Sequence, residues 1–298
     1  SSAGSAIAVA AGFCDAALGT ETRGSLMIPG FRNGVFSFKP TRGLISRSGI
    51  IPLSSSFDAP GVLARNPEIM KKVILAMVGV DLEDDQSFEL TKTESNPSRK
   101  RIICCVNRSL GEMELLQTKL RSFLAQLKLN GFEITFVDLP DVSFDYKTIS
   151  STDIRADITK FLHRYGSDNE PRSFEGLVEC YRERPHAHLY GMERLEDALA
   201  MPQIEKSELK KLVQENVVKA RNLINSILDR YDADFVGFLN FVDWFSIGGG
   251  PSCTLPVSFE TKPPISIMLG SRVGNDLALL DIVQEFSEVA KAAQHTDN

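Results

Sequence analysis

Residues 1–65 have the sequence SSAGSAIAVAAGFCDAALGTETRGSLMIPGFRNGVFSFKPTRGLISRSGIIPLSSSFDAPGVLAR. This stretch is dense in Gly, Ser, Ala and Pro, which favour tight turns and close approach of the backbone to a ligand. Residues 6–11 predict a helix of small residues that Gly12 ends, and residues 16–19 predict a short buried strand. Residues 20–25 then form a loop, where we expect the chemistry of this protein.

Four short motifs follow one another in this region. They are a Ser- and Gly-rich turn at the start, G-T-E-T-R-G-S at 19–25, K-P-T-R-G at 39–43 and S-F-D-A-P-G at 56–61. In this order they resemble the amidase-signature family of Ser-cisSer-Lys amidases, which includes peptide amidases, fatty-acid amide hydrolases and glutamyl-tRNA amidotransferase A subunits. The resemblance is closest over residues 1–80 and thinnest in the middle of the chain.

The resemblance implies a set of catalytic residues. Ser25 would be the nucleophile, and Ser1, which lies 24 positions earlier as in the family, would relay a proton to a neutral lysine base. The backbone N–H groups of Thr22, Arg23, Gly24 and Ser25 would form the oxyanion hole. The elements around Lys39 and Asp58 would support this loop.

Two departures from the family pattern bear on activity. The family usually has glycine where this chain has Arg23, and this cation would narrow the pocket, recruit an acidic substrate or mark lost activity. The family's lysine lies upstream of the first serine, whereas Lys39, Lys71 and Lys72 all follow the motif. We therefore expect that the N-terminal portion of the enzyme lies outside this chain and that these residues alone have little turnover.

The substrate pocket is predicted from Ser2 and from the C-terminal part of the chain. Residues 248–270 resemble the family's closing element, which lies near the acyl pocket, and Gly250 belongs to it. Trp244 either walls this pocket or belongs to the core. Gly248–Gly250 is interpreted as a turn that lines a pocket, because no G-K-[ST] sequence follows to form a phosphate loop.

Composition excludes several classes of function. The net charge is −6, from 39 acidic and 33 basic residues without a long basic stripe, so nucleic acid is not an expected partner. The longest uncharged stretch, residues 244–259, is broken by glycines and prolines and cannot span a membrane. The 5 cysteines show no CxxC spacing and indicate reduced thiols in a cytoplasmic protein, with any targeting signal in the missing N-terminal part.

No metal or cofactor is expected. His186 and His188 have no convincing third ligand for zinc, and no dinucleotide fingerprint is present. The chain has 4 histidines and none lies near either serine in the sequence, so a Ser-His-Asp enzyme fits poorly. The expected ligand is a small-molecule or peptide amide, and a homodimer is left open as the assembly.

The rest of the chain predicts an α/β fold. Strands are expected at 101–106, 133–137, 234–240, 253–257 and 265–269, and helices at 66–77, 113–127, 207–228 and 276–293. Residues 149–204 are interpreted as irregular, with short helices. Together these predict one amidase-signature domain over 1–298, with a mixed central β-sheet between two helical layers (α/β/α), a catalytic signature core at 1–80 and a helical peripheral layer at 140–230.

Three hypotheses for function remain at this point. The first is hydrolysis of linear carbon–nitrogen amide bonds through an acyl-enzyme on Ser25. The second is a catalytically silent, amidase-like binding protein, motivated by Arg23 and by the absent lysine. The third is a glutamine amidotransferase subunit that delivers ammonia to a partner.

Overall fold

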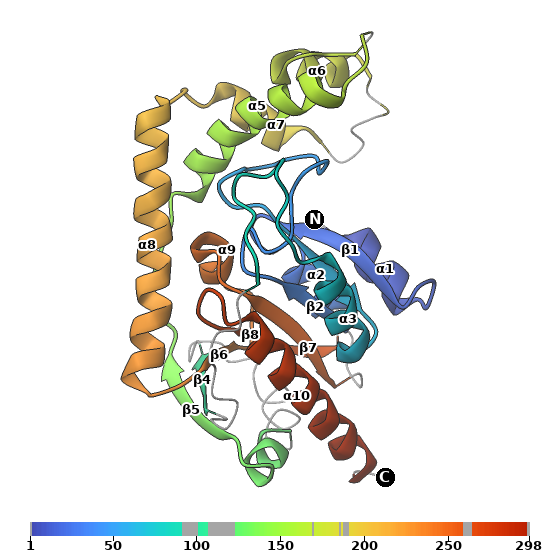
Figure 1. The fold of residues 1–298 in the computed structure, drawn as a ribbon, viewed down its shortest axis with the longest axis vertical. Coiled ribbons are helices and arrows are strands. Elements are labelled where there is room, and N and C mark those ends of the chain that lie inside the picture. Colours follow the sequence, from blue (N-terminus) through green and yellow to red (C-terminus); the bar gives the residue numbers. More distant parts are fainter. Residues whose placement is uncertain are drawn as a thin grey trace.

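The structure, a computed structural model, describes residues 2–90, 101–106, 123–168, 170–184, 186, 191–258 and 264–296. Within these residues eight strands form one sheet in the order β1-β3-β2-β7-β8-β6-β4-β5 (Figure 1). The strands are β1 (Ala16–Glu21), β2 (Phe36–Lys39), β3 (Ala59–Ala64), β4 (Arg101–Val106), β5 (Glu133–Asp138), β6 (Phe235–Phe238), β7 (Ser252–Ser258) and β8 (Ile265–Gly270).

The sheet is mixed, as the sequence predicted. β4 pairs in parallel with β5, where Arg101 lies opposite Glu133, and also in parallel with β6. All other described pairs are antiparallel. The parallel β4–β5 pair confirms the predicted β-α-β unit, although residues 113–122 of its expected helix lie outside the described residues and 123–129 are helical.

Helices cover both faces of this sheet, which confirms the predicted α/β/α architecture. They are α1 (Ala3–Ala10), α2 (Met27–Asn33), α3 (Pro67–Met77), α5 (Tyr146–Tyr165), α6 (Phe174–Arg182), α7 (Glu193–Ala200), α8 (Lys206–Arg230), α9 (Trp244–Gly248) and α10 (Asp276–Thr296). Helices α3 and α10 pack on one face, and α1, α2, α8 and α9 pack on the other.

Adjacent side chains of one strand pack into different cores on the two faces of the sheet. On β3, Val62 belongs to the core under α3 and α10, and Leu63 belongs to the core under α1 and α2. Ile102 and Ile103 of β4 divide in the same way. Side chains of a strand point alternately to opposite faces, so a strand buried on both faces is apolar at successive positions.

The predicted start of α3 is also confirmed. Asn66 caps this helix, since its Oδ1 accepts a hydrogen bond of 2.9 Å from the N–H of Ile69, and Pro67 occupies the first helical position. Proline is suited to this position because its missing N–H would have no partner inside the helix. A helix cap depends on residues a few positions apart, so the sequence alone predicts it.

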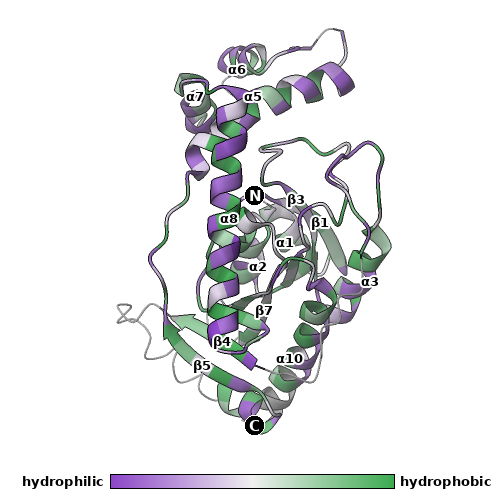
Figure 2. Ribbon diagram, turned by 60° about the vertical axis from the view of Figure 1, so that its left-hand side comes forward, coloured by the Kyte–Doolittle hydropathy of each residue, from purple (hydrophilic) through white to green (hydrophobic). Residues whose placement is uncertain are grey.

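The helical layer formed by α5, α6 and α7 differs from the expectation. Residues 149–204 were expected to be irregular with short helices, yet α5 alone has 20 residues. Its buried face carries polar side chains, among them Ser151, Asp153 and Asp157, so the apolar spacing that marks an amphipathic helix is absent. Helix α8, which has polar and apolar stripes, connects this layer to the sheet (Figures 1 and 2).

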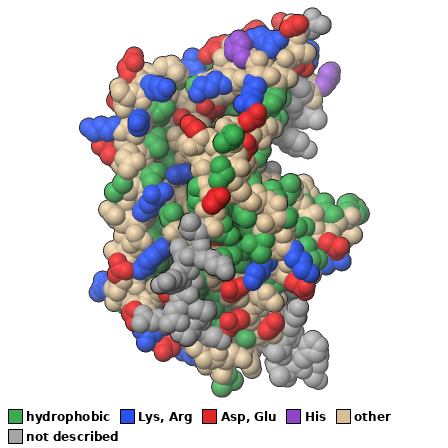
Figure 3. All heavy atoms as spheres, in the orientation of Figure 1, with side chains coloured by type: hydrophobic (Ala, Val, Ile, Leu, Met, Phe, Trp, Pro, Cys, Tyr) green, Lys and Arg blue, Asp and Glu red, His purple; other side chains and the backbone are tan. Residues whose placement is uncertain are grey.

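Apolar side chains are exposed at the β1 end of the sheet. Ile7, Phe13 and Leu18 are more than half exposed, and hydrophobic atoms gather on the protrusion formed by α1 and the turn after it (Figure 3). Among the described strands β1 pairs only with β3, so its other side is a free edge. None of the described helices is long and apolar enough to cross a membrane.

We predict that Phe286→Ala lowers the free energy of unfolding by about 3–5 kcal/mol, because it leaves a cavity in a packed core. Phe286 is 1% exposed, and its ring lies edge-on to those of Phe123 and Phe132. Urea unfolding followed by circular dichroism measures the change. Leu82→Ala is the control, since Leu82 is 98% exposed and its loss should change stability by less than about 0.5 kcal/mol. Equal effects of the two changes would contradict this packing.

Candidate active site

The loop that carries Ser25 connects β1 to α2. Gly24 in this loop has a φ of +91°, a backbone conformation that L side chains rarely adopt. A Cβ atom at this position would lie 2.7 Å from Cδ1 of Ile28 and 2.8 Å from Cζ of Phe241. Both the backbone angle and the crowding therefore require glycine immediately before Ser25.

Glu21, the last residue of β1, organises the start of α2. Its side chain is fully buried, and its Oε2 accepts hydrogen bonds from the N–H groups of Leu26 at 3.0 Å and Met27 at 2.9 Å. Its Oε1 accepts a hydrogen bond of 2.6 Å from Ser246 Oγ on α9. The first N–H groups of a helix have no partner within the helix, and this carboxylate satisfies two of them directly after Ser25.

Asp58 supports the same loop from its other side, as the sequence predicted. It accepts hydrogen bonds from Thr22 Oγ1 and from the N–H groups of Leu53, at 2.8 Å, and Ser54, at 2.9 Å. Burial raises the pKa of Asp58, while these hydrogen bonds oppose the increase. Thr22 is thereby tied to the turn that precedes β3.

Lys39, also predicted to support the loop, lies in the interior beneath it. Its Nζ donates hydrogen bonds to the carbonyls of Pro40, at 3.0 Å, and Gly250, at 2.5 Å. Removal from water lowers the pKa of Lys39 to about 8, although nearby Glu21 and Asp276 act in the opposite direction. Lys39 thus joins the end of β2 to the turn before β7.

Ser25 lines a cavity of about 780 Å³. Thr22, Arg23 and Gly24 line it as well, and α5 and α7 contribute its opposite wall. Among the described residues, the N–H groups of Arg23, Gly24 and Ser25 find no acceptor. These donors are therefore available to an oxygen atom of a ligand held in the cavity.

Ser2, which was predicted to bind substrate, contacts the backbone of Ser25 but is not among the residues that line the cavity. The N–H of Ser2 donates to the carbonyl of Ser25 at 2.8 Å, and its Oγ exchanges hydrogen bonds with the backbone of Thr20. Ser1 lies outside the described residues, so its proposed role stays a prediction.

Trp244 and Gly250 do not line the cavity that holds Ser25. Trp244 is 3% exposed, and its ring lies edge-on to that of Phe238 in the core under α8, with 5.1 Å between the ring centroids. Of the two interpretations of Trp244, the structure therefore places it in the core. Gly250 is buried beside Ser271 and holds Lys39 through its carbonyl.

Sequence reasoning missed several residues of the cavity wall. Tyr146 of α5, Arg194 of α7 and Phe241 line it together with Ser25. The guanidinium carbon of Arg23 lies 4.9 Å from the centre of the Tyr146 ring, and its Nε lies 2.8 Å from Oδ2 of Asp243. No motif marks Tyr146, Arg194 or Phe241, because these residues come from segments more than a hundred positions away from Ser25 in the sequence.

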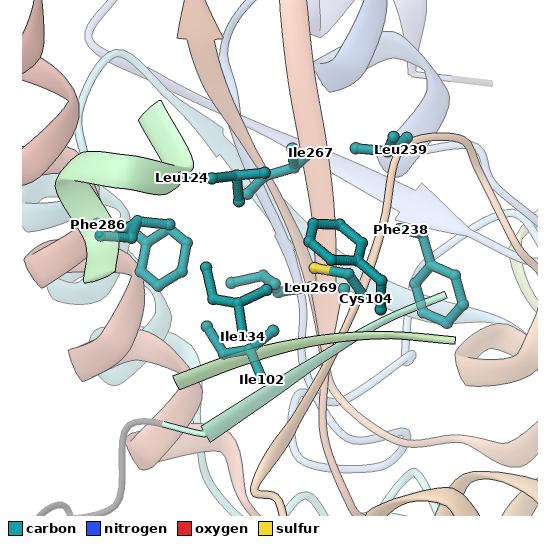
Figure 4. A pocket seen from close by; sticks show the side chains of 12 residues that line it. Ile102, Cys104, Leu124, Ile134, Phe238, Leu239, Ile267, Leu269 and Phe286 are labelled. Atoms are coloured by element: carbon teal, nitrogen blue, oxygen red, sulfur yellow. The ribbon is translucent and has the colours of Figure 1, made fainter. Parts of the chain in front are cut away.

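A second hollow lies in the core between the sheet and helices α3 and α10. Apolar side chains and one thiol gather around it (Figure 4), among them Ile102, Cys104, Leu124, Ile134, Leu269 and Phe286. Burial raises the pKa of the Cys104 thiol to about 12, so it stays protonated and unreactive. This hollow offers no group for amide chemistry.

The described residues contain no group of three His, Cys, Asp or Glu side chains that could hold a metal ion. His188, one of the two histidines considered in the sequence, lies outside them.

Comparison with known proteins identifies the class. The structure of an amidase family protein from Bacillus anthracis superposes with a TM-score of 0.88 at 23% identity, covering 98% of this chain and 60% of that one. Native peptide amidase from Stenotrophomonas maltophilia gives a TM-score of 0.85 at 23% identity, covering 97% and 65%. This likeness shows that the fold is that of the amidase-signature enzymes.

The sequence identifies the family. The profile of the Amidase family matches residues 1–237, and the chain belongs to this family. Among the glutamyl-tRNA(Gln) amidotransferase A subunits, that of Staphylococcus epidermidis is 28% identical over 310 aligned residues, covering 97% of the chain and 64% of that relative. The relative of the same name from Campylobacter lari is 34% identical over 180 residues, covering 57% and 39%. The chain thus spans less than two thirds of these relatives.

We predict that Glu21→Gln lowers the free energy of unfolding by about 2–3 kcal/mol, because glutamine keeps one acceptor oxygen and turns an NH₂ group toward donors. Hydrogen exchange should show faster exchange at Leu26 and Met27. Glu215→Gln is the control, because Glu215 is exposed and its ion pair with Lys211 Nζ is long, at 3.9 Å. This substitution should change the free energy of unfolding by less than about 0.5 kcal/mol. Unchanged exchange at both amides would contradict the role of Glu21.

The buried lysine predicts a pH dependence of stability. Because the pKa of Lys39 is about 8 in the fold and 10.5 unfolded, the unfolded chain binds more protons between these values, and stability rises with pH across this window. Relative to Lys39→Met, the free energy of unfolding of the unmodified chain should rise by on the order of 3 kcal/mol from pH 8 to 10.5. Urea unfolding of both proteins at each pH measures it, and a constant difference would contradict it.

Proposed function

We propose that this chain carries the nucleophile-bearing part of an enzyme that hydrolyses linear carbon–nitrogen amide bonds. The observation that carries the proposal is the position of Ser25, which lines a large cavity at the start of α2 beside backbone N–H groups that have no acceptor within the described part of the chain. Membership of the Amidase family supports the same reaction class.

In the proposed mechanism Ser25 Oγ attacks the amide carbonyl carbon and its proton is removed. The carbonyl oxygen becomes an oxyanion, which the N–H groups of Thr22, Arg23, Gly24 and Ser25 stabilise. The carbon–nitrogen bond then breaks, the nitrogen takes up a proton, and ammonia or an amine leaves. Water attacks the resulting ester, releasing the acid and restoring the serine hydroxyl.

The proton acceptor is proposed from the family resemblance. Ser1 would relay the proton of Ser25 to a lysine upstream of it. Lys147 lines the cavity, and its Nζ forms an ion pair of 2.8 Å with Oδ2 of Asp197 on α7. We therefore do not assign the role of the base to Lys147.

A fluorophosphonate probe tests the nucleophile in a protein that includes the upstream segment. We expect covalent labelling of Ser25, and we expect Ser25→Ala to abolish labelling and lower kcat for a primary amide at least about 10³-fold. Ser226→Ala is the matched control, since Ser226 lies on the exposed side of α8 and its hydroxyl donates a hydrogen bond of 2.9 Å to the carbonyl of Leu223. Its labelling and kcat should be unchanged.

Two outcomes would replace this proposal. Failure to label Ser25 in a correctly folded protein would favour a silent binding protein. Glutaminase activity that requires an added partner, without hydrolysis of simple amides, would favour a component of an amidotransferase, the activity that the names of the Staphylococcus and Campylobacter relatives state.

A further inference from the structure

The cavity that holds Ser25 is positively charged in a protein that is negative overall. Arg23, Arg32, Lys147 and Arg194 line it, and Asp197 is its one acidic lining residue among the described residues. The whole chain has a net charge of −6. A concave site of one charge sign raises the local concentration of ligands of the opposite sign.

Pairing leaves two of these cations uncompensated. Lys147 is neutralised by Asp197, and Arg23 is neutralised by Asp243, which lies outside the cavity lining. In the described part of the chain, neither Arg32 nor Arg194 has a carboxylate within ion-pair distance. The two guanidinium groups are therefore free to bind an anionic ligand.

The two arginines approach the cavity from different elements. Arg32 lies in the last turn of α2, seven positions after Ser25, a separation of about 10 Å at the rise of an α-helix. Arg194 comes from α7, the helix that lines the cavity with α5. Burial raises the pKa of the neighbouring Tyr146 phenol, and a hydrogen bond with Ser150 and the charge of Arg194 oppose this increase. The charge thus lies on the walls of the cavity and away from the reacting atom.

We propose that the substrate is an amide that also carries a carboxylate, which Arg32 and Arg194 bind while the amide carbonyl lies at Ser25. Planar guanidinium groups match the geometry of a carboxylate. The ion pair between Arg23 and Asp243 would hold the Arg23 guanidinium against the Tyr146 ring. This inference rests on the proposed function and defines its substrate class.

A pair of linear ligands tests this proposal. Suberamate and octanediamide have the same carbon chain with an amide at one end. At the other end suberamate carries a carboxylate and octanediamide carries a second amide. Binding is measured by calorimetry at low ionic strength to the chain with Ser25→Ala, so no turnover enters the measurement. We expect suberamate to bind at least about fivefold more tightly, the effect of one partly exposed ion pair.

Charge variants show where the carboxylate binds. In the Ser25→Ala background, Arg32→Gln combined with Arg194→Gln should remove the preference for suberamate over octanediamide. With both arginines present, about 0.3 M salt should weaken this preference. Arg182→Gln is the control, since Arg182 is exposed on α6 and pairs with Glu179 at 3.2 Å outside the cavity lining. It should leave the preference intact.

Three results would overturn the inference: equal affinity for both ligands, a preference that persists in the Arg32 and Arg194 double variant, or no binding of either ligand to the folded protein. Each result is independent of the fluorophosphonate experiment, which reports the reactivity of Ser25. A carboxylate preference without labelling would support carboxylate binding by Arg32 and Arg194 and would overturn the proposed hydrolysis, and with it the description of this ligand as a substrate.

Discussion

The buried carboxylate of Glu21 is the constraint on which the Ser25 loop depends. Glu21 is the last residue of β1, and its carboxylate accepts hydrogen bonds from the first N–H groups of α2 and from the hydroxyl of Ser246 on α9. Three elements therefore meet at one side chain. A buried carboxylate without such donors would be costly, and these donors would otherwise be unsatisfied. The carboxylate requires these donors and the donors require an acceptor, so their hydrogen bonds fix the turn between β1 and α2 that contains Ser25.

Carboxylates also join the helical layer to the sheet. Asp153 of α5 accepts hydrogen bonds from Ser54 and Ser56, and Asp157 accepts one from the N–H of Ser55. The next turn of the chain carries Asp58, which holds Thr22 beside the cavity. A continuous set of hydrogen bonds therefore runs from α5 to the Ser25 loop, and its partners are backbone amides and short side chains with few alternative positions.

The parts that sequence reasoning could predict are those with local signals. The cap at Asn66, the β4–β5 pair and the loop that carries Ser25 all depend on neighbouring residues, and each appears in the structure. The length of α5 could not be predicted, because its buried polar face does not follow apolar periodicity. Of the cations of the cavity, the sequence marks Arg23, whereas Arg32, Lys147 and Arg194 could not be predicted, since α2, α5 and α7 meet only in three dimensions.

The cavity has a floor and a wall of different origin. The floor consists of residues around Ser25, held by the buried carboxylates of Glu21 and Asp58, whereas the wall comes from α5 and α7. Helix α5 is attached both by hydrogen bonds to Ser55 and Ser56 and by an apolar cluster of Ile149 with Phe57. Arg194 and Asp197 of α7 line the cavity and belong to neither attachment. An ancestral chain of this architecture could therefore acquire new substrates by drift in one helical segment while its chemistry stayed under separate selection.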